Sequence, residues 1–162
     1  MKKTIIIFLI GGILGSGAGF VLGIFFYPFI FLNDIVASDT IENRELKTIV
    51  ADGTFIQANP NDPVHYGKGA VTIFKDVLHL GKAFEVGPGP KYKVLLVETA
   101  SVKKSADVKK SNFVDLGLLR AFKGSQNYKI PANVDLKKYK SVVIWCETFS
   151  ALISPATLDF RK

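Results

Sequence analysis

One residue of the sequence brings redox or nucleophilic chemistry, the lone cysteine Cys146. A cysteine reacts as its thiolate, which requires a nearby cation or helix N-terminus to lower the pKa. In an extended strand Val142 and Ile144 share the face of Cys146, and such apolar neighbours raise a thiol pKa. Two interpretations therefore stay open, a redox-active thiol and a packed, unreactive cysteine.

Four other side chains are candidates to support a redox centre at this cysteine: Trp145, Tyr139, Tyr128 and His79. Tyr139 precedes a strand by two residues, where a tyrosine can place its ring in the core and bond backbone across a corner. The exposed aromatics have a second interpretation. If two of Tyr66, Tyr92 and Tyr128 cluster with Trp145, they form a platform for a carbohydrate or a quinone.

The sequence supports neither a haem nor a metal site. The only methionine is Met1, and the two histidines, His65 and His79, lack metal-ligand spacing. Motifs of common enzymes, such as G-x-S-x-G, H-E-x-x-H, a phosphate loop and C-x-x-C, are also missing. Gly87 and Gly89 alternate with prolines, which indicates a turn and not a nucleotide cradle. We expect no cofactor and no conventional catalytic activity.

The strongest strand signal runs from Ser141 to Phe149 and contains Cys146. Its alternate positions are largely apolar on both sides. Such a pattern predicts a central strand covered on its two faces, with Trp145 opposite Cys146.

The N-terminus predicts a membrane helix, because no charged residue occurs between Lys3 and Asp34. The apolar run from Thr4 to Leu32 is long enough to cross a bilayer. A cleavable signal peptide is the alternative, although its apolar region is usually shorter. Lys2 and Lys3 favour a cytoplasmic N-terminus, which would place the rest of this single-pass protein outside the cell or in a periplasm.

Glycines recur every four residues in this helix, at Gly11, Gly15, Gly19 and Gly23. Positions four apart share one helix face, where glycine lets a second helix approach closely. The spacing makes a homodimer one of two open interpretations, since glycine is common in membrane helices generally.

We expect three parts in the chain: an anchor at 1–32, a polar tether at 33–45 and one domain at 46–162. Without Lys2 and Lys3 the chain keeps 19 basic and 14 acidic residues, a net charge of +5. An exported domain rarely meets nucleic acid, so attraction to anionic lipid or a cell-wall polymer is one interpretation of this charge. The other is that Lys103, Lys104, Lys109 and Lys110 simply solvate a loop.

Turn residues divide the domain into short strands. The runs 70–74 and 77–80 flank Lys75-Asp76 as a hairpin, and Asp52-Gly53 favours a turn or a bulge. Pro155 restricts the last strand to an edge or a bulge. About seven or eight strands without a long soluble helix predict an all-β protein, an antiparallel β-sandwich behind one N-terminal transmembrane helix.

Several segments in order resemble the DM-thirteen domain family, which occurs beside DOMON domains in Skeletor-like proteins. The segments are Asp52-Gly53-Thr54-Phe55, Leu80-Gly81 to Phe84, Gly87-Pro88-Gly89-Pro90, Leu116 to Leu119, Lys123 to Tyr128 with Ile130-Pro131, and Tyr139 through Cys146 with Phe149 and Ala156. The resemblance covers about 46–160.

The resemblance implies a β-sandwich with a role in extracytoplasmic electron transfer or redox sensing, attributed to a cysteine in a late strand. Cys146 matches that position. A redox protein would then be the partner. The rival function is an interaction domain that binds a protein or a wall polymer while Cys146 only packs.

Overall fold

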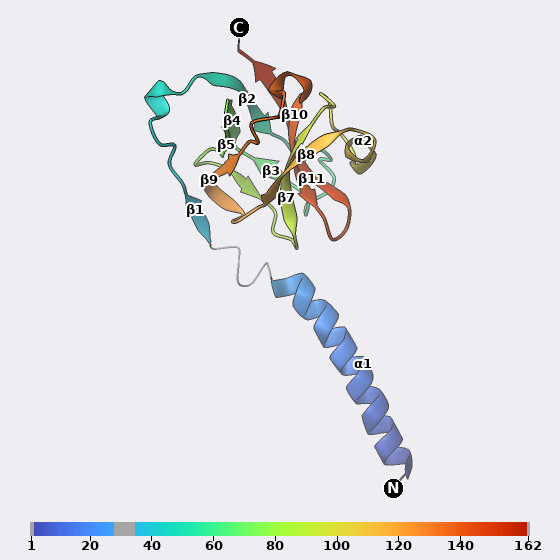
Figure 1. Ribbon diagram of the computed structural model, residues 1–162. Coiled ribbons are helices and arrows are strands. Elements are labelled where there is room, and N and C mark those ends of the chain that lie inside the picture. The colour runs from blue at the N-terminus through green and yellow to red at the C-terminus, as the bar shows by residue number, and fades with distance from the viewer. Residues whose placement is uncertain (1, 28–34, 162) are drawn as a thin grey trace.

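A computed structural model describes residues 2–27 and 35–161, and it shows one long helix followed by a β-rich domain (Figure 1). Residues 28–34, where the expected anchor meets the expected tether, lie outside the described part. The helix, α1, runs over Lys2–Tyr27. Its span Lys2–Ile24 has a mean hydropathy of 2.4 and is not covered by the domain. By length and composition α1 is able to cross a membrane or to serve as a signal sequence.

The domain is built from eleven strands, one α-helix and two 3₁₀ helices. The strands are β1 (Val36–Ser38), β2 (Ile49–Phe55), β3 (Gly67–Lys68), β4 (Ala70–Phe74), β5 (Val77–Leu80), β6 (Glu85–Val86), β7 (Tyr92–Val97), β8 (Phe113–Leu118), β9 (Lys123–Lys129), β10 (Ser141–Cys146) and β11 (Ala151–Phe160). The helices are η2 (Arg44–Leu46), α2 (Ser105–Lys109) and η3 (Leu136–Lys138). The all-β prediction is confirmed. The strand number exceeds the expected seven or eight because β1, β3 and β6 have only two or three residues each.

The strands form one curved sheet in the order β3-β6-β9-β5-β4-β2-β11-β10-β7-β8. All neighbours along this path are antiparallel, and the predicted hairpin is the pair β4–β5. Near the end of the path β10 lies between β7 and β11. It is therefore the covered central strand that its two apolar faces predicted.

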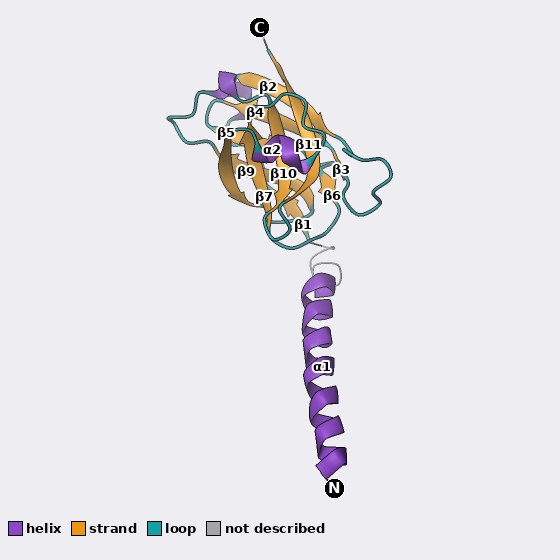
Figure 2. Ribbon diagram, turned by 90° about the vertical axis from the view of Figure 1, so that its right-hand side faces the viewer, coloured by secondary structure: helices purple, strands orange, loops and turns teal. Residues whose placement is uncertain are grey.

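Two apolar cores lie on the two sides of β10. Val142, Ile144 and Cys146 point into the main core inside the curved sheet. Val143 and the half-buried Trp145 point the other way, into a smaller core closed by α2. Figure 2 shows α2 in front of β7, β10 and β11. The short lysine-rich segment thus covers apolar sheet surface that would otherwise face water.

One local prediction differs from the structure, and a second holds in one of its two alternatives. Asp52-Gly53 itself forms neither a turn nor a bulge but lies inside strand β2, and the register of β2 and β4 shifts before it, between Ile49 and Ala51. Glycine is needed there because a Cβ would collide with the Thr157 carbonyl of β11. Pro155 lies in an interior strand and not at an edge, but the register of β10 and β11 shifts close to it, between Ile144 and Trp145, in line with the bulge alternative.

Part of the expected tether belongs to the sheet. β1 pairs in parallel with β9, and Ala37 lies opposite Gly124. Next to β1, Asp39 makes an ion pair with Arg120 and accepts a hydrogen bond from the Asn127 N–H (2.9 Å). The segment at 36–39 is therefore bound to the domain.

Candidate functional site

Cys146 ends β10 and is almost fully buried, with 1% of its surface exposed. It lies opposite Tyr92 of β7 and belongs to the main core. Its Sγ donates a hydrogen bond to the Pro90 carbonyl oxygen at 3.3 Å. Burial raises the pKa of the thiol, and backbone N–H groups of Thr148 and Phe149 offset this only in part. In this conformation the sulfur is a neutral thiol.

The segment that covers the sulfur is the loop 87–90, the Gly-Pro-Gly-Pro turn. Its two prolines restrict the backbone, and a Cβ at Gly89 would overlap the Tyr92 hydroxyl group. On its other side Tyr92 packs edge-on against Phe122, with 5.7 Å between the ring centroids. Both rings line a surface cavity of about 240 Å³ that also contacts Gly89. The loop 87–90 and the rings of Tyr92 and Phe122 thus lie between the thiol and the surface.

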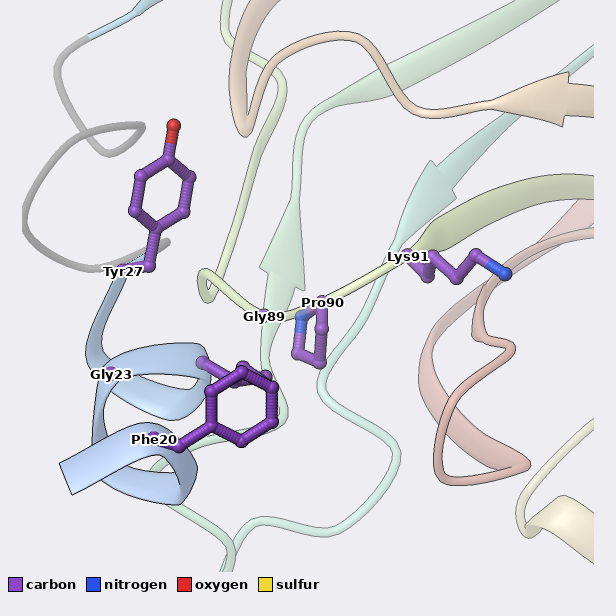
Figure 3. A pocket seen from close by; sticks show the side chains of 7 residues that line it. Phe20, Gly23, Tyr27, Gly89, Pro90 and Lys91 are labelled. Atoms are coloured by element: carbon purple, nitrogen blue, oxygen red, sulfur yellow. The ribbon is translucent and has the colours of Figure 1, made fainter. Parts of the chain in front are cut away.

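The same loop lies beside the C-terminal end of α1. A cavity of about 590 Å³ separates Phe20, Gly23 and Tyr27 of the helix from Pro90 and Lys91 (Figure 3). Its walls are almost entirely apolar. When α1 spans a bilayer, this cavity and the loop lie at the membrane surface, where tyrosine and lysine side chains are favoured.

Of the four supporting candidates, only Trp145 is a neighbour of Cys146 in the chain, and it points to the opposite face of β10. Tyr139 lies before Ser141, which is itself about 17 Å from Cys146 along β10. Its ring packs partly into the main core. Its hydroxyl has no hydrogen bond with any residue that the structure describes, so the expected corner is only half formed.

Tyr128 and His79 belong to a polar cluster on β5 and β9, away from Cys146. Tyr128 is buried and donates its hydroxyl to the Gln126 side-chain oxygen (2.8 Å). The His79 Nδ1 atom lies 2.7 Å from the Asn127 Oδ1 atom. The structure therefore does not gather the five sequence candidates into one site.

Gln126 was missed by the sequence analysis although its side chain is fully buried. The Oε1 atom accepts hydrogen bonds from the N–H groups of Arg120 (3.1 Å) and Ala121 (3.2 Å) and from the Tyr128 hydroxyl. The Nε2 atom donates to the Ala121 carbonyl (2.8 Å). Gln126 thereby fixes the segment before Phe122, which lines the cavity beside Tyr92. A buried glutamine inside a polar strand leaves no pattern in the sequence.

Metal-binding side chains are dispersed in the described residues, 2–27 and 35–161. No three His, Cys, Asp or Glu side chains lie close enough there to hold a metal ion together. His65, in the loop before β3, instead bonds Asp62 at 2.7 Å.

The family model described as Electron transfer DM13 matches residues 60–158, which includes the loop 87–90 and Cys146. No curated protein and no solved structure matches the chain.

Proposed function

Because the chain belongs to the Electron transfer DM13 family, we propose that it is a membrane-anchored electron-transfer module whose redox group is the Cys146 thiol. The observation that best supports this role is the position of the loop 87–90. It covers the sulfur on one side and lies beside the end of α1 on the other. A redox thiol at this place would meet partners at the membrane surface.

The burial of the thiol makes the proposed reaction conditional on a local opening. A neutral sulfur that donates to the Pro90 carbonyl is not a nucleophile. Displacement of the loop would remove this hydrogen bond, hydrate the sulfur and return its pKa towards the ordinary value.

A lone cysteine can take part in a balanced redox reaction by thiol–disulfide exchange with a disulfide of a partner protein. The Cys146 thiolate attacks one sulfur of that disulfide, a new S–S bond forms, and the partner's second sulfur leaves as a thiolate that takes up a proton. The sulfur of Cys146 is oxidised and the leaving sulfur is reduced. We propose a membrane redox protein as the partner, with the N-terminus of the chain cytoplasmic and the domain outside.

The experiment uses the full chain in phospholipid nanodiscs with oxidised glutathione as the disulfide. Mass spectrometry gives the rate of the mixed disulfide directly, because Cys146 is the only cysteine. Replacement of Pro90 by glycine loosens the loop by about 0.4–1 kcal/mol, so the rate should rise about two- to fivefold. Pro131→Gly, at an exposed position between β9 and η3, is the matched control and should leave the rate unchanged.

The proposal is wrong if the folded chain forms no mixed disulfide, or if Pro90→Gly and Pro131→Gly change the rate equally. Cys146 would then be a packing residue, and the interaction domain would be the remaining function. A colourless protein with an unreactive thiol would have no redox group in this domain.

A further inference from the structure

A second site lies on the face of the sheet opposite Cys146. It is an open cleft of about 320 Å³ between α2 and the strands β7, β8 and β10. Nine residues line it: Lys93, Leu95, Val108, Lys109, Phe113, Asp115, Trp145, Glu147 and Ser150. We call this cleft the glycan cleft. Trp145 alternates with Cys146 along β10, so the glycan cleft is separate from the proposed redox site.

The polar groups of the glycan cleft are held in place before any ligand arrives. The Lys93 ammonium lies 2.6 Å from Asp115 Oδ2 and 2.9 Å from Glu147 Oε1. The second oxygen of Asp115 accepts the Gly117 N–H (2.9 Å), and Lys91 contacts the second oxygen of Glu147 (3.2 Å). Donors and acceptors thus alternate across the cleft in fixed positions, which lowers the entropy cost of binding.

Backbone irregularities place these groups. The register of β7 and β8 shifts between Lys93 and Leu95, and Gly117 there has a φ of 114°, which favours glycine. The register of β10 and β11 shifts beside Trp145. Bulges of this kind re-aim side chains and occur next to binding sites.

The exposed apolar groups of the cleft are aromatic rings. Trp145 is half-buried, and Phe113 leaves 51% of its surface exposed although it lies on a paired strand. Leu95 and Val108 are buried beneath them. Large exposed rings beside a fixed polar network are typical of binding sites where one side of the ligand is apolar and the other polar.

We propose that this cleft binds a neutral glycan. A sugar ring has an apolar C–H face, which suits Trp145 and Phe113, and hydroxyl groups that both donate and accept. Those hydroxyls suit the carboxylates of Asp115 and Glu147 and the ammonium of Lys93. The two lysines and two carboxylates that line the cleft balance in charge, so the charge favours a neutral ligand over a phosphate or an acidic polymer.

The same contacts favour binding over cleavage. Lys93 and Lys91 lower the pKa of Glu147, so its carboxylate accepts hydrogen bonds but has no proton for a leaving group. The cleft would therefore hold the domain against a neutral oligosaccharide without hydrolysing it.

The test uses the fluorescence of Trp145, the only tryptophan of the chain. The full chain in phospholipid nanodiscs, free of sugar detergents, is titrated with chitotetraose and with cellotetraose. We expect a saturable change in emission with at least one of them. Phe113→Ala should weaken binding about two- to tenfold, and Asp115→Asn at least about tenfold.

Ile56→Ala is the matched control, because Ile56 is as exposed as Phe113 (56%) and lies outside the cleft. It should bind like the parent chain. Circular dichroism checks that each variant is folded. If Asp115→Asn does not fold, Lys93→Gln provides a second variant of the polar groups. No emission change with either tetrasaccharide would overturn the assignment, as would equal affinity of the folded cleft variants and the parent. Tighter binding of tetragalacturonate would overturn the neutral class of ligand.

Discussion

Replacement of Gln126 by methionine should be the most destabilising single change in the polar cluster on β5 and β9. Methionine nearly preserves the volume of the buried side chain but makes none of its four hydrogen bonds. The Ala121 N–H, the Ala121 carbonyl and the Tyr128 O–H donor then lose their partner, whereas the Arg120 N–H still has the Tyr128 oxygen at 3.3 Å. About three groups stay unsatisfied, at about 1 kcal/mol each. The expected loss of unfolding free energy is about 3 kcal/mol.

The assay is urea unfolding of the full chain in a zwitterionic detergent, followed by Trp145 fluorescence. Because the wild-type Tyr128 hydroxyl has a partner, Tyr128→Phe alone should cost about 1 kcal/mol. In the Gln126→Met background the same replacement removes an unsatisfied hydroxyl and should cost nothing or stabilise. A loss below about 1 kcal/mol for Gln126→Met, or an equal cost of Tyr128→Phe in both backgrounds, would refute the reasoning.

Three further outcomes are expected. The Arg120 guanidinium lowers the pKa of Asp39, so its contribution to stability is complete above the ordinary carboxyl range and is lost as the pH falls through the lowered value. The protection factors of the β1 amides, taken relative to their intrinsic exchange at each pH, should therefore fall in acid, and Asp39→Asn should abolish that step. Gly53→Ala should destabilise the domain by more than about 2 kcal/mol in urea unfolding, because its Cβ meets the Thr157 carbonyl. Gly15→Leu should reduce any dimer cross-linked in membranes, since it fills the glycine face of α1, and an unchanged dimer yield would exclude that face.

The strands that sequence predicted best are those with an apolar pattern of their own. β10 was recognisable as a central strand because Val142 and Val143 begin two alternating apolar rows. Gly53 was misread, since a glycine that permits close approach of another strand has the same local sequence as one in a turn. The strand at 36–38 could not be recognised from the sequence, because three residues are too few to show an alternating apolar pattern. Its partner, residues 123–125, lies far away in the chain.

The candidate sites depend on contacts that the sequence does not contain. The sequence placed Cys146 and Trp145 on opposite faces, and the structure agrees. It did not place the loop 87–90 over the sulfur, because that contact joins residues 56 positions apart. The glycan cleft depends on two register shifts and on α2. The ion pairs of Lys93 arise only once β7 and β8 are aligned.

The most direct test of the redox proposal is the rate of Cys146 modification by a thiol reagent, measured from zero urea up to the unfolding transition. If the loop opens locally, the rate at low urea should be independent of urea and faster than global unfolding permits. It should also rise with pH towards the raised thiol pKa. A rate that follows global unfolding at every urea concentration would contradict the account and leave Cys146 as a packing residue.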